Sequence, residues 1–379
     1  MHVLIITDGY PNAYIPMQGV FVRDQARALA RNGVQVGVLA CVPVSIRDVI
    51  RIGWKKLRAE KQIREHLQEM IQCFVQIPKN YSYPIDRIAT LGKALIRDYI
   101  ANHGLPDVVH VHGFHAGKLG TYIRDKYNLP LVVTEHNSRF IAGTLDDSRK
   151  KFAIDFFRKA DVRIAVSHTF RDCLEQITSL PFEVIPNAVD VQAFQPGVNK
   201  NTFIFLSAGR FDDNKNQALQ LRAFAKIAHQ IESAELWLAG DGPARASCER
   251  LAQELAITNR IRFLGMLSRE ELMRTMQAAS VFLISSKHET FGVVAIEAMS
   301  CGLYVISTPC GGTEDTVRGL GHITDGTQED FAHAMLQAYA NRASHQPQVL
   351  HNAMANRFSY EAVASQLKQV YSQLLQSRS

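Results

Sequence analysis

Long apolar runs are absent from this sequence of 379 residues. No uninterrupted stretch approaches the roughly 18 apolar residues that a membrane-spanning helix requires, so we expect no transmembrane segment. The chain begins with Met-His followed by four apolar residues, and no basic residue precedes them. That pattern favours a buried strand over a secretory signal peptide, and it leads us to expect a cytoplasmic protein.

Cysteine and excess charge are both sparse. The six cysteines form no CxxC pair and show no Cys/His spacing typical of zinc, so we expect reduced thiols and no disulfide framework. Lys and Arg number 42 against 36 Asp and Glu, which leaves a formal charge of +6. This mild excess suits an anionic ligand or an anionic membrane surface, and it is too small to indicate nucleic acid as a partner.

Short apolar segments alternate with helical patterns from end to end. Strands are predicted at residues 3–7, 35–40, 108–112, 131–134 and 162–166, and again at residues 202–208, 235–239, 261–264, 281–284 and 303–307. This rhythm indicates α/β structure with parallel sheets covered on both faces. A turn-rich stretch near 187–200 divides the chain, so we expect two doubly wound Rossmann-like domains, 1–187 and 188–359, that face each other across a cleft. A last helix, in residues 360–379, would cap either half.

The densest chemical signal is the segment from His288 to Gly302, which follows a predicted strand. Ligands of such sheets bind beyond the carboxyl ends of the strands. Glu289 would lie in the loop before a helix, and Glu297 would lie about a turn and a half inside it. The first-turn amides of Phe291, Gly292 and Val293 would offer unpaired donors to a phosphate. The alternative is an amphipathic helix with two solvated glutamates.

Cations follow the first strand of the same half. Arg210 and Lys215 come after Gly209, which permits close backbone approach, and they would offset a diphosphate placed near the two carboxylates. The alternative reading, two ordinary surface cations, fits Lys215 better than Arg210. Glu314 is either a further hydroxyl ligand or an acid at a helix N-terminus.

These motifs, taken in order, resemble the retaining glycosyltransferases of family four, which have the GT-B fold. The motifs are Gly209-Arg210 with Lys215, Gly240-Asp-Gly-Pro243, Glu289 with Glu297, and Gly311-Gly312 with Glu314. The resemblance is strong from about residue 184 and weaker before it. It implies a nucleotide sugar held by the C-terminal half, with Arg210 and Lys215 on the diphosphate, the amides of 291–293 as a phosphate cradle, Glu297 on the ribose and Glu289 near the donor sugar.

The resemblance also assigns roles in the N-terminal half. Gly19 would let the backbone approach the donor phosphates, although Gln18 stands where the family often has a second glycine. His136 resembles the histidine that faces the donor sugar, and His112 is a second catalytic candidate. A hydrogen-bonded loop histidine is the alternative for both. A zinc site at His110, His112 and His115 is not expected, because a fourth ligand is missing.

The implied reaction moves a sugar from a nucleoside-diphosphate sugar to a hydroxyl of a glycan or a lipid-linked acceptor, as in envelope polysaccharide or glycolipid synthesis. The family is thought to retain configuration by front-face attack. No DxD metal motif and no GxGxxG after the first strand are present, so we expect neither a metal nor a resident cofactor. A GT-B-like epimerase or phosphorylase, or a non-catalytic sugar-nucleotide-binding protein, stays an alternative.

The segment 46–70 has a helical pattern in which many charges alternate with Ile50, Trp54, Leu57 and Ile63. Its charged residues are Arg47, Asp48, Arg51, Lys55, Lys56, Arg58, Glu60, Lys61, Arg64, Glu65 and Glu69. Such a helix would lie on an anionic membrane surface or clasp a lipid-diphosphate acceptor. The alternative is an ordinary solvated face, which mixed-charge helices more often form.

Overall fold

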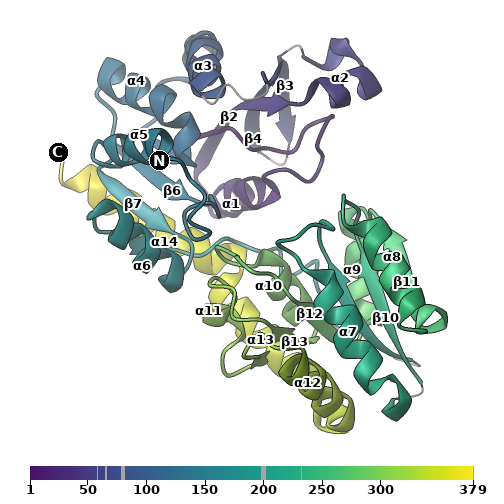
Figure 1. The fold of residues 1–379 in the computed structure, drawn as a ribbon. Coiled ribbons are helices and arrows are strands. Elements are labelled where there is room, and N and C mark those ends of the chain that lie inside the picture. The colour runs from purple at the N-terminus through teal and green to yellow at the C-terminus, as the bar shows by residue number, and fades with distance from the viewer. Residues whose placement is uncertain (58, 65, 78–81, 198–201, 232, 379) are drawn as a thin grey trace. The chain divides into compact units, whose positions relative to one another are not determined.

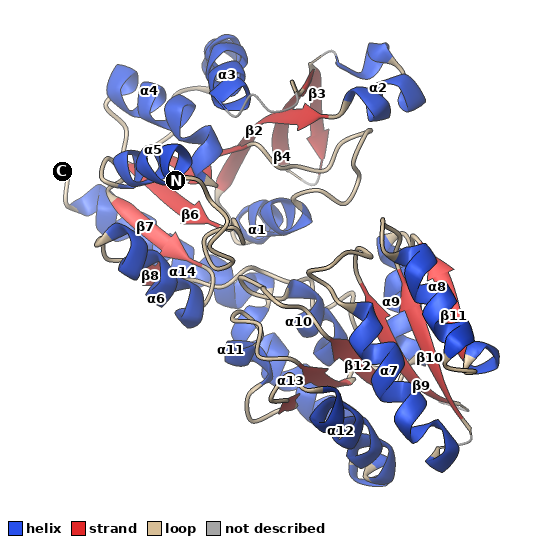
Figure 2. Cartoon of the chain, viewed as in Figure 1, coloured by secondary structure: helices blue, strands red, loops and turns tan. Residues whose placement is uncertain are grey.

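The structure is a computed structural model, and it describes residues 1–57, 59–64, 66–77, 82–197, 202–231 and 233–378. Backbone contacts divide the chain into two compact units. One unit combines Met1–Val189 with Ser359–Ser379, and the other is Asp190–Phe358. Each unit contains a sheet with helices on its faces (Figures 1 and 2).

The described part of the N-terminal unit has an eight-stranded sheet in the order β3-β4-β2-β1-β5-β6-β7-β8. All neighbouring pairs are parallel except β3 and β4, which run antiparallel. The strands are β1 (His2–Thr7), β2 (Gln35–Val44), β3 (Glu60–Arg64), β4 (Leu67–Val75), β5 (Val108–His112), β6 (Leu131–Glu135), β7 (Val162–Ala165) and β8 (Glu183–Val184).

Helices of this unit pack on both faces of the sheet, as expected for right-handed crossovers between parallel strands. Helix α1 packs against α14 on one side, and α3 packs against α4 on the other. The helices are α1 (Val20–Arg31), α2 (Ile46–Ile52), α3 (Ser82–His103), α4 (Gly117–Tyr127), α5 (Asp147–Phe157), α6 (His168–Thr178) and α14 (Tyr360–Gln376), with short 3-10 turns η1 (Trp54–Leu57) and η2 (Phe114–Ala116).

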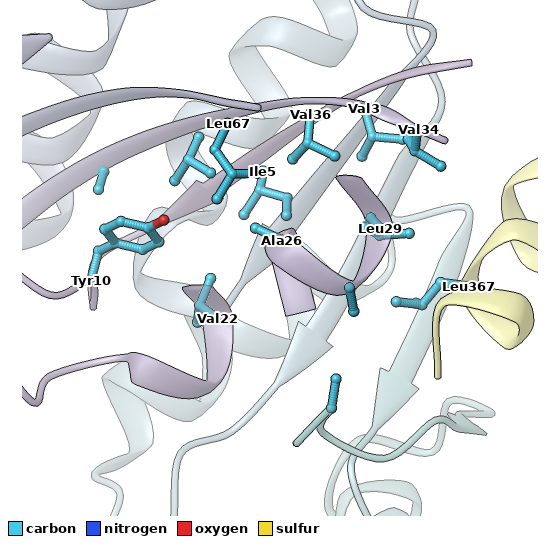
Figure 3. Close-up of a cluster of buried hydrophobic side chains, with 14 of the residues drawn as sticks. Val3, Ile5, Tyr10, Val22, Ala26, Leu29, Val34, Val36, Leu67 and Leu367 are labelled. Carbon is cyan, nitrogen blue, oxygen red and sulfur yellow. The ribbon is translucent and has the colours of Figure 1, made fainter. Parts of the chain in front are cut away.

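One apolar core joins the face of this sheet to α1 and α14. Val3 and Ile5 of β1 contact Ala26 and Leu29 of α1, and Leu367 of α14 joins the same cluster (Figure 3). These side chains are fully buried. The last helix therefore completes the core of the first unit, and burial of its apolar stripe holds it there.

The C-terminal unit has, in its described residues, a six-stranded parallel sheet in the order β11-β10-β9-β12-β13-β14. The strands are β9 (Phe203–Ala208), β10 (Ala234–Ala239), β11 (Ile261–Gly265), β12 (Val281–Ile284), β13 (Tyr304–Ser307) and β14 (His322–Ile323). The main helices are α7 (Gln217–Ile227), α8 (Arg245–Glu254), α9 (Arg269–Ala278), α10 (Val293–Ser300), α11 (Glu314–Val317), α12 (Gln328–Ala340) and α13 (Pro347–Phe358), and three short 3-10 turns accompany them, η3 (Ala228–Gln230), η4 (Thr258–Arg260) and η5 (Arg342–Ser344).

The predicted fold class is confirmed: both units are α/β with a sheet of Rossmann-like order, which is parallel throughout except at the β3–β4 pair. The predicted strands recur with ends shifted by a few residues at most. Within the described ranges, no helix is both long enough and apolar enough to cross a bilayer.

The prediction of one long helix over 46–70 is wrong. Helix α2 ends at Gly53, whose φ of 113° is open to glycine and rare for other residues. The chain then forms η1, and β3 pairs antiparallel with β4. Arg58 and Glu65 lie outside the described residues, as do the side chains of Lys56 and Arg64.

Candidate active site

The C-terminal unit brings three strand exits to one edge of its sheet. The loops that follow β9, β12 and β13 leave the same edge because the three strands are parallel and adjacent. Asn214 connects two of them: its side chain donates to the carbonyl of His288 at 3.1 Å and accepts from the amide of that residue at 3.1 Å. The third loop joins at Glu289, whose amide donates to the carbonyl of Cys310 at 2.7 Å.

Lys215 and Glu289 form an ion pair across this edge. The Ser286 hydroxyl donates to the same carboxylate oxygen of Glu289 at 2.7 Å. The side chains of Lys215 and Glu289 keep 28% and 17% of their exposure, so the pair is accessible to a ligand. The methylene groups of the Lys215 side chain lie beside Gly209. A Cβ added at Gly209 would lie 3.5 Å from the Cε of Lys215. The sequence-predicted cation and carboxylate are thus direct neighbours.

Helix α10 begins a few residues after Glu289, and its first backbone amides have no acceptor in the part of the chain that the structure describes. Gly292 is its N-cap with φ 77°, and a Cβ there would lie 2.6 Å from a methyl carbon of Thr313. Gly312 is equally tight, because its Cβ would lie 2.2 Å from the amide nitrogen of Phe291. Among the described residues, the amides of Phe291, Gly292 and Val293 donate no hydrogen bond. Within the described ranges, the three amides that the sequence predicts as phosphate donors are thus left without an acceptor at the start of α10.

Glu297 lies on α10 and is 8% exposed. Its carboxylate faces the guanidinium of Arg269 at 3.5 Å, and that guanidinium stacks 5.5 Å from the ring centroid of Phe194. Sequence reasoning missed Arg269, because the contact joins the start of α9 to α10 through the tertiary fold. The arginine thus supplies a positive partner to this nearly buried carboxylate.

Arg210 and Glu314, two further residues singled out in the sequence, make different contacts from Lys215. The Arg210 side chain is 71% exposed, and its nearest carboxylate, Asp212, lies 3.7 Å away. Glu314 accepts two hydrogen bonds from the amide of Gly311, at 2.9 and 2.8 Å. The structure thus shows Glu314 as an acid at the start of α11, which is the simpler of its two predicted roles.

In the N-terminal unit, the loop after β1 folds back onto itself. Gly19 is the N-cap of α1 with φ 63°, and a Cβ there would lie 2.0 Å from the carbonyl oxygen of Gly9. The Thr7 hydroxyl bonds to both backbone groups of Gly9 at 3.0 Å. Glycine is required at position 19 by this contact alone. The loop places the first amides of α1 at the end of the sheet.

The predicted histidines lie side by side at the exits of β5 and β6. Nδ1 of His112 and Nε2 of His136 are 3.0 Å apart, and the two rings are stacked with centroids 5.2 Å apart. The other ring nitrogen of His112, Nε2, is buried and has no hydrogen-bond partner among the described residues. His110 serves the core instead, bonded to Tyr371 and Thr134 at 2.7 Å each.

Burial sets the charge of this pair. It lowers the pKa of His112 to about 3 and the pKa of His136 well below its ordinary value, with a contribution from the neighbouring imidazole. Both rings are therefore neutral near pH 7. Burial also lowers the pKa of His115, but the Asp8 carboxylate, 3.1 Å away, outweighs that effect and raises it overall.

Glu135 is a buried carboxylate that sequence reasoning missed. It accepts backbone hydrogen bonds from Phe114, His136 and Asn137 at 2.8–2.9 Å. Burial raises the pKa of Glu135, and these amides oppose the rise. The carboxylate fixes the backbone that carries His136. An acid directly before the histidine at a strand exit was the available signal.

A polar cavity of about 320 Å³ lies beside the loop after β1. The Tyr10 hydroxyl donates to one oxygen of buried Glu69 at 2.5 Å, and the Gln62 amide donates to the other oxygen at 2.9 Å. Arg23 and Glu60 also line it. Within the described ranges, no group of three or more His, Cys, Asp or Glu side chains is arranged to hold a metal ion.

Two Rossmann-like units in one chain are the architecture of the GT-B fold, and solved structures with this fold match the whole chain. The sucrose-phosphate synthase structure from Thermosynechococcus elongatus matches with a TM-score of 0.82 and 24% identity over all of both chains. The Anabaena HepE structure in complex with UDP matches with a TM-score of 0.75 and 18% identity over 98% of this chain and 100% of that one. These likenesses concern the fold.

The sequence comparisons give the family. The family model described as "Glycosyl transferases group 1" matches residues 189–362, and the model described as "Glycosyltransferase Family 4" matches residues 18–193. The chain belongs to glycosyltransferase family four.

Curated relatives are moderately similar. The D-inositol 3-phosphate glycosyltransferase of Corynebacterium diphtheriae is 26% identical over 93% of this chain and 88% of that protein. The phosphatidylinositol N-acetylglucosaminyltransferase gpi3 subunit of Schizosaccharomyces pombe is 28% identical over 57% of this chain, a match that spans half of that relative's length.

Proposed function

We propose that this glycosyltransferase moves a sugar from a nucleoside-diphosphate sugar to a hydroxyl of a glycan or a lipid-linked acceptor, with retention of configuration. One observation carries the proposal: the Lys215–Glu289 pair lies at the sheet edge where the unbonded first amides of α10 begin. A cation and three aimed amides suit a diphosphate, and a neighbouring carboxylate suits sugar hydroxyls.

Each group in the C-terminal unit has a distinct proposed task. Lys215 and the amides of 291–293 neutralise the charge that develops on the departing diphosphate, and exposed Arg210 adds to this when the donor is bound. Glu289 orients hydroxyls of the donor sugar. Glu297, held by Arg269, accepts hydrogen bonds from the ribose hydroxyls. The chemistry then depends on charge neutralisation by protein groups, without a metal or a resident cofactor.

The N-terminal unit supplies the proposed acceptor side. Neutral His136 and His112 offer hydrogen bonds without adding positive charge, which suits contact with an uncharged sugar. His136 is the proposed catalytic or orienting residue, and His112 sets its tautomer through the 3.0 Å contact. The polar cavity beside Tyr10 and Glu69 has the mixed donors and acceptors that bind acceptor hydroxyls.

The comparisons support this proposal by analogy. One solved neighbour is described as a complex with UDP and glucose, and the curated relatives carry names of transferases that act on inositol 3-phosphate or on phosphatidylinositol. A phosphorylated or lipid-linked polyol is therefore a reasonable first class of acceptor. An envelope role and a cytoplasmic location follow from the same reasoning as proposals.

A thermal-shift screen over uridine and guanosine diphosphate sugars tests donor binding, because a ligand that binds the folded state raises the melting temperature. Product analysis then separates the candidate reactions. Transfer releases the nucleoside diphosphate in an acceptor-dependent way, an epimerase returns an isomeric nucleotide sugar, and a phosphorylase requires inorganic phosphate. The anomeric configuration of the product, read by NMR, decides between retention and inversion.

His136→Ala tests the assignment of the N-terminal unit. We expect nucleotide affinity to stay within about twofold and the transfer rate to fall by about a hundredfold, since general acid–base or orienting groups contribute on this scale. Wild-type transfer by this variant would remove His136 from the mechanism while leaving the donor site intact.

A further inference from the structure

Exposed apolar side chains gather on one short segment of the N-terminal unit. Ile50 of α2 is 71% exposed, Trp54 of η1 is 59% exposed and Ile46 of α2 is 39% exposed. Ile52 of α2 is 37% exposed as well. Large apolar side chains scattered singly on a surface are ordinary, but four within nine residues form a patch.

Cations are interleaved with these side chains. Helix α2 is anchored by Val49, which is fully buried. At 100° per residue, Arg47, Ile50 and Arg51 lie on the half of the helix opposite Val49, and Ile46 lies about 60° from Val49 at the first position of the helix. Lys55 follows next to Trp54 and is exposed as well. We call Ile46, Arg47, Ile50, Arg51, Trp54 and Lys55 the α2 surface.

The charge of this segment is one-sided. Residues 45–57 contain four basic residues and one acidic residue, Asp48, which lies 3.1 Å from Arg51. A patch with isoleucines, an interfacial tryptophan and excess positive charge is complementary to a bilayer with anionic headgroups.

We infer that the α2 surface docks this protein on an anionic lipid bilayer, with Ile46, Ile50 and Trp54 inserted at the headgroup level and Arg47, Arg51 and Lys55 on the lipid phosphates. This differs from the long helix predicted from the sequence, because the inserted element is one short helix and the 3-10 turn after Gly53.

The α2 surface is connected to the loop of the proposed site. The Tyr14 hydroxyl, in the loop between β1 and α1, donates to the carbonyl of Gly53 at 2.6 Å. Gly53 lies between Ile50 and Trp54. Docking therefore presents the loop from Gly9 to Gly19 to the lipid surface, although lipid binding itself does not require the proposed transfer reaction.

Vesicle co-sedimentation tests the inference with the full chain. We expect wild-type protein to bind vesicles of phosphatidylcholine mixed with phosphatidylglycerol, and to bind vesicles of phosphatidylcholine alone at least about tenfold more weakly. Ile50→Ser with Trp54→Ser should weaken binding to the anionic vesicles by about tenfold or more. Val349→Ser, at an apolar side chain exposed on α13, is the matched control and should bind like wild type.

The charge contribution has its own matched pair. Arg47→Glu with Lys55→Glu should abolish the preference for anionic vesicles. Arg222→Glu with Arg250→Glu changes the net charge equally at exposed positions of the C-terminal unit and should keep that preference. Equal losses in the two double variants would mean that overall charge binds the vesicles, which overturns the assignment to the α2 surface.

Fluorescence reports insertion directly, because the chain has two tryptophans and Trp237→Phe leaves Trp54 alone. We expect its emission to shift to the blue on anionic vesicles. An unchanged spectrum, or equal binding to neutral vesicles, would overturn the inference. Dimerisation in sedimentation velocity that Ile50→Ser with Trp54→Ser abolishes, without vesicle binding by wild type, would assign the surface to a second copy instead.

Discussion

Single side chains in the C-terminal unit lie where charge decides ligand binding. The Lys215 side chain keeps 28% of its exposure and pairs with the Glu289 carboxylate, so its ammonium group is accessible to a diphosphate. Glu297 differs, because Arg269 already neutralises it. Donor phosphate and donor ribose would therefore be recognised by two carboxylate–cation pairs of different exposure.

Lys215→Ala should weaken binding of UDP or GDP by about tenfold to a hundredfold, the range for one hydrogen bond to a charged group. Isothermal titration calorimetry measures the change. Lys226→Ala is the control, since Lys226 also pairs with a glutamate of the same unit, Glu329, but lies in the last turn of α7. Equal affinities in wild type and Lys215→Ala would contradict the proposed diphosphate site.

The neutral histidines predict a pH dependence of stability. Burial holds the pKa of His112 at about 3, below its unfolded value near 6.5, so between these values the unfolded chain binds more protons. Stability should then fall as the pH drops below about 6.5, by up to about 1.4 kcal/mol per pH unit for each such ring. His115 has a raised pKa and acts in the opposite direction.

Chemical denaturation at pH 7 and pH 5 isolates the contribution of His112. The His112→Gln variant should lose less stability over this interval than wild type, because one buried titrating group is removed. An identical loss in the two proteins would show that His112 does not titrate on unfolding in this range.

At the scale of elements, the helices and strands that could be predicted are those whose sequence pattern is set by local structure. Parallel strands buried on both faces read as apolar runs, so β5 and β12 were placed correctly. The segment 46–70 was predicted wrongly. Its apolar residues Ile63, Leu67 and Met70 follow helical spacing, but the chain from Leu67 onward forms strand β4 because it pairs with β2.

The contacts of the candidate site also fall into those that could be predicted from the sequence and those that could not. Parallel strands bring Lys215 and Glu289 to one edge although 74 positions separate them in the chain, so their proximity could be predicted from topology. The contact of Glu297 with Arg269 could not, because it joins α10 to the start of α9, and the packing of these two helices is set by the tertiary fold. Whether these residues act as proposed stays a prediction.

The two positive-φ glycines that flank α1 make a matched pair. Gly19→Ala should destabilise the protein by well over the about 1–2 kcal/mol that a left-handed conformation costs, because its Cβ would lie 2.0 Å from Gly9. Gly33→Ala, with φ 80° and nothing within 4 Å, should cost only that conformational energy. Thermal unfolding compares them, and equal melting temperatures would contradict the close approach.

At the scale of the whole molecule, the chain crosses between its units twice. Helix α13 ends the C-terminal unit at Phe358, and α14 returns to the N-terminal one. The return is stabilised by burial: Leu367 and Tyr371 are fully buried, and Tyr360 donates to buried Asp24 at 3.0 Å. The N-terminal unit is therefore discontinuous in sequence, and the C-terminal unit is continuous.

Leu367→Ala should lower stability by about 2–5 kcal/mol, the usual range for a leucine deleted from a packed core. Because the residue belongs to the N-terminal unit, calorimetry should show the transition of that unit shift most. Leu374→Ala, at a partly buried position of the same helix, is the control and should cost less. A uniform shift of all transitions would indicate that the units unfold together.

The return of α14 has a consequence for biosynthesis. A nascent chain that has left the ribosome as far as residue 189 contains every strand of the first sheet but exposes the apolar stripe of α1 that α14 covers. Residues 190–358 contain the whole core of the C-terminal unit, so this unit can fold before α14 is synthesised and covers the stripe. Translation that stops soon after residue 358 would thus yield a folded C-terminal unit and an N-terminal unit with an exposed apolar stripe, which chaperones and proteases would recognise.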